Sequence, residues 1–283
     1  MSDQAPAALA PAHDAPKVRL GTLTSAEAAA RLAAGATVLL PLGSHEDQGP
    51  HAPMGDYLSA ERISEMIAGR AIGQGHDTLV APVLPFGGRD FFGSRPGGMA
   101  LEQSTLRLVL RDMLDGLLRH DFTRLIVVNG HGGNAQAIHD VTQAVLLERG
   151  VLIPSFYLWK IAGGLLPELL DPVQARASAG HGADPLASVA MHLFPELMRP
   201  DLIPSSPPLP RSVAGLFVSG FGTARFEGVE IGLPIELGDD AVTGDASLCS
   251  AETGALITER LVSLGAAFIA HLTNHMAWQD LDG

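Results

Sequence analysis

Short apolar runs alternate with amphipathic segments along this chain of 283 residues. Four of the runs are rich in β-branched residues and have the length of strands that are buried on both faces: 37–42, 78–84, 124–129 and 151–157. Between them, the segments at 58–72 and 104–120 carry apolar residues at helical spacing. Strands that alternate with helices in this way predict an α/β fold with a mostly parallel sheet covered by helices.

The two ends of the chain and one later region have other patterns. Residues 1–17 are rich in alanine and proline, and we expect a disordered leader there. Helices are expected at 23–35, where a Thr/Ser cap precedes helix-forming residues, and at about 251–275. The region 200–245 is rich in proline and glycine and shows little periodicity. Because we find neither an internal repeat nor a clear boundary, we expect residues 18–283 to form a single domain.

Composition and charge narrow the classes of function. The 31 acidic and 18 basic residues give a net charge of -13, which argues against nucleic acid as a partner. The single cysteine, Cys249, excludes an internal disulfide and a zinc site built on cysteines, and it favours a cytoplasmic location. We expect no membrane partner, because no run approaches the roughly 18 apolar residues that cross a bilayer.

Two polar loops directly follow predicted strands. The first, PLGSHEDQGPHAPMGDY at 41–57, contains Glu46 and Asp56, and the second, NGHGGN at 129–134, contains His131. Because ligands bind beyond the carboxyl ends of parallel strands, we expect both loops at one edge of the sheet. Two carboxylates and an imidazole form a ligand set suited to Zn, Mn or Fe. Judged on the residues alone, a solvated acidic loop and a tight strand-to-helix turn remain open interpretations.

The same two loops resemble motifs of the creatininase (creatinine amidohydrolase) family. Its members carry Pro-x-Gly-Ser-x-Glu-x-His-Gly-Pro-His-x-Pro, an acidic residue shortly after it, and Asn-Gly-His-Gly-Gly-Asn after a later strand. Three further segments are similar to family motifs in the same order: SRPGGMAL at 94–101, AGHGADPLAS at 179–188 and TGDASLCSAETG at 243–254. The resemblance extends from about residue 20 to residue 275.

The resemblance implies a fold, a class of reaction and roles for four residues. It implies a three-layer α/β/α sandwich, assembled into a homo-oligomer, that hydrolyses amide bonds of small, often cyclic molecules with bound divalent metals. Glu46, Asp56 and His131 match the metal ligands of the family, and His181 matches the histidine that handles protons during ring opening.

Two departures from the family pattern concern a second metal ion. The family histidine two places after the ligand glutamate is Gln48 here, and the family glutamate five places after the catalytic histidine is Leu186. Both are ligands of the second ion in creatininases, so we expect one divalent metal ion per chain, Zn, Mn or Fe. Either His45 or His51 is expected to add a further ligand.

Three residues are predicted to bind the substrate. Arg89 lies in a glycine-rich loop at 85–98, which suits an anion clamp at a pocket mouth but equally suits an oligomer contact. Trp159 lies in a segment that resembles a tryptophan-bearing segment of the family, which favours contact with substrate. Buried aromatic residues usually belong to the core, so a structural role is the alternative. Asp184 is expected to orient His181, to pair with substrate or to cap a helix that begins nearby.

The leading functional hypothesis is a metal-dependent hydrolase that acts on an amide of a small polar metabolite, with a cyclic amide as the expected substrate. Water activated by the metal would attack the carbonyl, and His181 would deliver a proton to the leaving nitrogen. Hydrolytic opening of a cyclic ketone or lactone by the same site is an alternative. A metal-poor subunit that serves only in binding or assembly is another alternative, and the retention of four functional residues disfavours it.

Overall fold

The structure is a computed structural model that describes residues 17–89, 96–120, 122–206, 209, 211–220, 222–233 and 241–275. At its centre lies a parallel sheet in the order β2-β1-β3-β4. The strands are β1 (Thr37–Leu42), β2 (Thr78–Val80), β3 (Leu125–Asn129) and β4 (Ser155–Tyr157). The four predicted strands and their parallel arrangement are therefore confirmed.

Two of these strands are much shorter than predicted, and prolines account for the difference. β2 ends at Val80, two residues before Pro82, and β4 begins at Ser155, directly after Pro154. A proline has no backbone N–H to donate to a neighbouring strand, so it favours strand ends and edges. These two apolar runs therefore overestimate their strands, whereas β1 has its predicted bounds although it contains Pro41.

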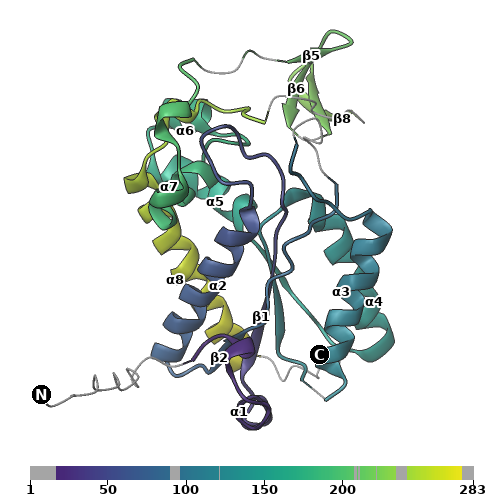
Figure 1. The fold of residues 1–283 in the computed structure, drawn as a ribbon. Coiled ribbons are helices and arrows are strands. Elements are labelled where there is room, and N and C mark those ends of the chain that lie inside the picture. The colour runs from purple at the N-terminus through teal and green to yellow at the C-terminus, as the bar shows by residue number, and fades with distance from the viewer. Residues whose placement is uncertain are drawn as a thin grey trace, which may run out of the picture.

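Helices cover both faces of the sheet (Figure 1). One face packs on α2 (Asp56–Gly73), α5 (Leu158–Leu169), α7 (Leu186–Leu193) and α8 (Ala251–His275), and the other on α3 (Gln103–Leu118) and α4 (Ala135–Arg149). Within β1, Leu39 belongs to the first core, whereas Val38 and Leu40 belong to the second. Side chains alternate between the faces of a strand, so both cores share one sheet. The predicted three-layer α/β/α sandwich is confirmed.

Two shorter helices flank this body. α1 (Ser25–Ala33) begins with a capping box, in which the Thr24 side chain accepts from the Glu27 N–H and Glu27 accepts from the Thr24 N–H. α6 (Pro172–Ser178) begins at a proline and is capped by the Asp171 carboxylate. The helix predicted at 23–35 is confirmed, because its Thr/Ser signal acts as the expected cap.

α8 contains 25 residues and is the one helix of the described residues that is long and apolar enough to cross a membrane. It packs against α2 and α7 without room for larger side chains at two glycines. A Cβ on Gly265 would lie 2.5 Å from Ile67, and a Cβ on Gly254 would lie 1.8 Å from the Ser188 carbonyl oxygen. Such close packing on neighbouring helices is typical of a core helix of a globular domain.

A second, antiparallel sheet projects from the α/β body in a region where no strands were predicted (Figure 1). It consists of β5 (Ser212–Val213), β6 (Leu216–Gly220), β7 (Thr223–Phe226) and β8 (Val229–Gly232). Its strands have two to five residues, and its turns contain positive φ angles at Ala214, Gly215, Glu227 and Gly228. Strands of this length carry too few alternations to be recognised by periodicity.

Two predicted segments lie outside the described residues, in whole or in part. Of the expected leader at 1–17, only Lys17 is described, and its Nζ lies 2.9 Å from Oε1 of Glu27. Of the glycine-rich loop at 85–98, residues 90–95 are outside the described ranges. The predicted leader and the single domain at 18–283 therefore stay predictions.

Candidate metal centre and active site

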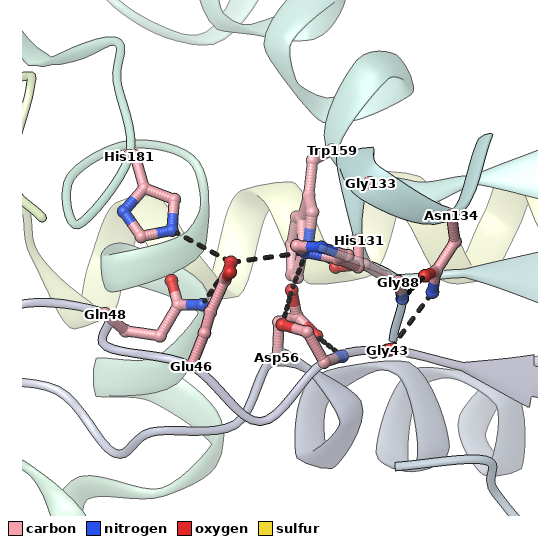
Figure 2. A network of polar contacts seen from close by, with 12 residues as sticks. Gly43, Glu46, Gln48, Asp56, Gly88, His131, Gly133, Asn134, Trp159 and His181 are labelled. Carbon is pink, nitrogen blue, oxygen red and sulfur yellow. Dashed lines mark hydrogen bonds and ion pairs between the residues drawn. The ribbon is translucent and has the colours of Figure 1, made fainter. Parts of the chain in front are cut away.

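Asn134 ties together the loops that follow the central strands. It ends the NGHGGN motif, donates from Nδ2 to the Gly43 carbonyl at 3.0 Å and accepts the Gly88 N–H at 3.0 Å. Gly43 also lets the start of α2 lie close to this loop, because a Cβ there would lie 2.3 Å from the Cα of Tyr57. The polar loops after β1 and β3 therefore meet at one edge of the sheet (Figure 2), as the fold class predicts.

Glu46, Asp56 and His131 converge at this edge (Figure 2). Nδ1 of His131 lies 3.2 Å from Oε1 of Glu46 and 3.2 Å from Oδ2 of Asp56. All three side chains are buried, and the atoms that they offer as ligands lie within 4.8 Å of one another. The structure thus brings together the three residues that were predicted to bind metal.

Burial and mutual attraction shift the pKa values of these groups. Burial alone would raise the pKa of Glu46, but hydrogen bonds with His131 and then His181 lower it to about 2. Burial would lower the pKa of His131, yet Asp56 and then Glu46 raise it to about 10. Burial also raises the pKa of Asp56, and His131 offsets only part of that effect. A pair of buried carboxylates that draws a proton onto the neighbouring imidazole would likewise attract a metal cation.

The donor set fits one divalent transition metal. Two carboxylates and an imidazole are ligands that Zn, Mn and Fe accept, and Oε2 of Glu46 is buried without a hydrogen-bond partner in the described part of the chain. Among the described residues, neither His45 nor His51 joins this group of ligands. Burial lowers the pKa of His51, and its contact with the Gly182 backbone opposes that shift. A fourth ligand from His45 or His51 stays a prediction.

Ser44 orients Asp56 and was not singled out in the sequence. Its backbone N–H donates to Oδ1 of Asp56 at 2.5 Å, and its hydroxyl donates to Oδ2 at 3.1 Å. Asp56 is the first residue of α2, where the helix dipole also favours a carboxylate. The sequence contained one indication of this role, because the Ser44 hydroxyl lies two residues before the predicted ligand Glu46 and metal ligands are commonly supported by hydrogen bonds from nearby residues.

His181 lies on the loop between α6 and α7, beside the candidate ligands (Figure 2). Its Nε2 is 3.4 Å from Oε1 of Glu46, and its Nδ1 is 2.5 Å from the carbonyl oxygen of Ala241. A carbonyl oxygen only accepts hydrogen bonds, so Nδ1 carries a hydrogen and Nε2 faces Glu46. The predicted proton-handling residue therefore lies within reach of the candidate metal site.

Comparison with known sequences places the chain in a family. The sequence profile of the creatininase family, described as creatinine amidohydrolase, matches residues 21–269. The chain belongs to the creatininase family. Members of this family are metal-dependent amidohydrolases, and the named relatives of the chain are an amidohydrolase and two peptidases.

Three curated relatives cover different shares of this creatininase-family chain. A mycofactocin precursor peptide peptidase from Mycolicibacterium smegmatis is 32% identical over 165 residues, which cover 56% of this chain and 58% of the relative. A creatinine amidohydrolase from Pseudomonas putida is 29% identical over 209 residues, with 68% and 77% covered. A second mycofactocin precursor peptide peptidase, from Mycobacterium ulcerans, is 28% identical over 260 residues, with 90% and 91% covered. The first match thus spans less than two thirds of that relative.

Solved creatininase structures share the fold. A creatininase variant complexed with creatine has a TM-score of 0.71 at 24% identity, and covers 92% of this chain and 99% of its own. A creatininase variant of the Zn-Zn type has a TM-score of 0.72 at 24% identity, with 92% and 98% covered. A creatininase described with Mn has a TM-score of 0.70 at 22% identity, with 92% and 99% covered. These similarities support the creatininase fold of the chain.

Gln48 and Leu186 stand where the family pattern expects ligands of a second ion. Gln48 is fully buried, and its Nε2 lies 3.5 Å from Oε1 of Glu46 (Figure 2). Leu186 is the first residue of α7 and is also buried. An amide oxygen is a weak ligand for a transition metal and leucine has no donor atom, so neither side chain favours a second ion.

The structure places the predicted substrate residues at different depths. The Trp159 indole N–H donates to the Gly130 carbonyl, so this ring supports the loop that carries His131. Asp184 lies in the same loop as His181, is buried and accepts a hydrogen bond from the Ser188 hydroxyl. Arg89 is exposed and has a φ of 64°. Substrate contact by Arg89, Trp159 and Asp184 stays a prediction.

Tyr157 is a further polar residue near the site, and it was not predicted from the sequence. It ends β4 opposite Asn129, and its hydroxyl lies 3.0 Å from the position that a Cβ on Gly132 would occupy. Burial, and then the charges of Asp56 and Glu46, raise the pKa of Tyr157 to about 12. Its phenol is therefore protonated at neutral pH and is available as a hydrogen-bond donor. Tyr157 could have been predicted near the site from its position, because it ends a strand that runs beside β3.

Proposed function

We propose that this creatininase-family chain hydrolyses an amide C–N bond with one divalent ion, Zn, Mn or Fe, held by Glu46, Asp56 and His131. His181 is the proposed proton carrier. The observation that supports this proposal most directly is the position of His181, whose Nε2 lies 3.4 Å from a buried carboxylate of the candidate ligand set. General acid/base catalysis needs a titratable group within reach of the reacting atoms, and the position of His181 beside a proposed metal ligand supports that role.

Each residue of the site has a separate part in this mechanism. A bound divalent ion supplies a Lewis acid that lowers the pKa of water and polarises the substrate carbonyl. Nε2 of His181 accepts a proton from the attacking water and returns it to the leaving nitrogen, while Nδ1 stays bonded to the Ala241 carbonyl. Glu46 and Asp56 would hold the ion as carboxylates, and Ser44 keeps Asp56 in place.

Two substrate classes fit this chemistry. The similarity to a creatinine amidohydrolase favours a cyclic amide in a small polar metabolite, and the exposed guanidinium of Arg89 would suit an anionic group on it. The similarity to two mycofactocin precursor peptide peptidases favours a peptide bond as the second candidate. Both reactions break a C–N bond and require the same proton delivery to nitrogen. A cytoplasmic homo-oligomer stays part of the proposal.

A substrate screen with matched variants tests this function. The purified wild-type protein, loaded with Zn or Mn, is incubated with creatinine, cyclic dipeptides, short linear peptides, lactones and cyclic ketones, and products are identified by mass spectrometry. His181→Asn and His131→Ala are screened in parallel. We expect hydrolysis of an amide that depends on both residues. Hydrolysis confined to lactones or ketones would favour the alternative reaction, and a protein without bound metal or turnover would favour a binding subunit.

A further inference from the structure

A short segment near the carboxyl end of the domain holds the loop that carries His181. We call residues 241–245 the clasp. The Thr243 hydroxyl accepts the His181 backbone N–H at 2.8 Å, and the Thr243 N–H donates to the His181 carbonyl at 2.8 Å. Two residues after Thr243, the Asp245 N–H donates to the carbonyl oxygen of Ala177, which lies four residues before His181, at 2.9 Å. Thr243 thus holds both backbone polar groups of His181.

The clasp and the His181 loop are pressed together without space for side chains. A Cβ on Gly180 would lie 2.4 Å from the Gly244 nitrogen, and a Cβ on Gly244 would lie 2.4 Å from the Ser178 carbonyl oxygen. Gly182 has a φ of +67°, and a Cβ there would lie 2.7 Å from the Ala241 carbonyl oxygen. Backbone atoms on both sides limit movement of the loop, because they cannot give way as a flexible side chain can.

The same segment also fixes the direction of the imidazole ring. The Ala241 carbonyl is 2.5 Å from Nδ1 of His181, whereas Oε1 of Glu46 is 3.4 Å from Nε2. The ring therefore lies between an acceptor on the clasp and a carboxylate of the candidate metal site. A rotation of the ring by half a turn would place carbon atoms where the two nitrogens lie and would break both contacts. A shift of the loop would likewise move Nε2 away from Glu46, and the geometry needed for proton transfer would be lost.

We propose that Thr243 is a positioning residue, which holds His181 so that Nδ1 donates to Ala241 and Nε2 faces Glu46. This inference rests on the proposed role of His181 in amide hydrolysis. The Thr243 hydroxyl does not touch the reacting atoms and acts through the backbone of His181. Loss of the hydroxyl leaves the His181 N–H without its acceptor, and the loop then shifts to satisfy that donor elsewhere.

Kinetics of matched variants test the role of Thr243. Thr243→Val removes the acceptor and keeps the shape, Thr243→Ser keeps the acceptor, and Thr142→Val removes a hydroxyl that bonds within α4. For the amide that the wild-type protein hydrolyses, we expect kcat of Thr243→Val to fall by roughly 10- to 100-fold with little change in KM or metal content. Thr243→Ser should restore most of kcat, and Thr142→Val should resemble wild type. A wild-type kcat in Thr243→Val, or equal damage in Thr243→Ser, would overturn the proposal.

A second measurement does not require a known substrate. Long-range proton–nitrogen NMR spectra of the metal-loaded protein distinguish a hydrogen on Nδ1 from one on Nε2, and the spectrum of His181→Asn identifies the His181 signals. We expect the Nδ1–H form in wild type and in Thr243→Ser, with the Nε2–H form appearing in Thr243→Val. An Nε2–H form in wild type would overturn the inference even if every variant failed to fold. If no amide is hydrolysed, the proposed function fails, and the NMR result decides this inference by itself.

Discussion

Nε2 of His181 lies 3.4 Å from Oε1 of Glu46, and the same oxygen of Glu46 lies 3.2 Å from Nδ1 of His131. One candidate metal ligand, Glu46, therefore lies close both to another ligand, His131, and to the candidate proton carrier. Because His181 is held by Thr243 and Ala241 through separate contacts, its removal need not disturb Asp56. Metal binding and proton transfer are thus expected to be separable by mutation.

The first prediction concerns this separation. His181→Asn should retain the bound metal and lose turnover by about 10²- to 10⁴-fold, a typical loss for a general acid/base group. Metal content is measured by elemental analysis, and turnover is measured with the amide identified in the screen. His139→Asn, at an exposed position of α4, is the control and should keep both properties. Near-normal turnover of His181→Asn would show that its assigned role is wrong.

The second prediction concerns the number of metal ions. Wild type should contain one divalent ion per chain, because Gln48 and Leu186 lack the donors that a second ion would need. Glu46→Gln should bind the ion much more weakly, since a neutral amide replaces a buried carboxylate. The double variant Gln48→His, Leu186→Glu should take up more metal than wild type. Elemental analysis measures the metal content of each variant, and anomalous diffraction locates the ions. Two fully occupied ions in wild type would contradict the prediction.

The layers of the fold were predictable because the two central strands, β1 and β3, are buried along their whole length and consist mostly of apolar residues. In β1, Val38, Leu39 and Leu40 are all buried, so the run itself carries the information. The sheet of β5 to β8 was not predictable in this way. Its exposed Phe217 and Phe226 lie in strands of five residues or fewer, where turn geometry rather than burial determines the structure.

The site was predictable only as far as its motifs extend. Glu46, Asp56 and His131 lie in loops whose residue types suggest metal ligands. Ser44 supports Asp56 from within the same loop, whereas Thr243 supports His181 from 62 residues further along the chain, and a hydroxyl in a sequence does not reveal so distant a partner. Supporting contacts of this kind need a structure to be identified.

The third prediction separates strain from function at Arg89, which adopts a φ of 64°. A left-handed backbone costs a residue with a side chain about 1 to 2 kcal/mol, and glycine avoids this cost. Arg89→Gly should therefore be more stable than Arg89→Ala, by about 1 kcal/mol in denaturant unfolding. Both variants should raise KM similarly, because both remove the guanidinium. If Arg89→Ala alone raises KM, then backbone geometry rather than charge governs substrate binding.

The fourth prediction tests the packing of α8 on α7. In Gly254→Ala, the new Cβ would lie 1.8 Å from the Ser188 carbonyl oxygen, so the helices must move apart. Overpacking of this kind typically costs about 1 to 3 kcal/mol, and the thermal midpoint should fall. Gly69→Ala in α2 is the matched control, since no atom lies within 4 Å of its new Cβ. The control should gain up to about 1 kcal/mol from helix propensity, and equal midpoints for the two variants would contradict this packing.

The last prediction concerns acid stability and the ion pair between α2 and α8. Arg70 donates to both carboxylate oxygens of Glu259 at 2.9 Å. Arg70, and then Ser263, lower the pKa of Glu259 from 4.5 to about 2. Because the pKa is lower in the folded state, the pair contributes fully above about pH 4.5, and its contribution is lost as the pH falls toward 2.

Glu259→Gln should therefore be less stable than wild type at pH 7, and the difference should disappear between about pH 4.5 and pH 2. Urea unfolding at several pH values measures this difference. The effect is expected to be small and to decrease in high salt, because both side chains are exposed. Arg70→Gln should produce the same pH dependence, and the double variant should lose little more than either single variant. A difference that persists unchanged at pH 2 would mean that Glu259 acts through packing rather than through its charge.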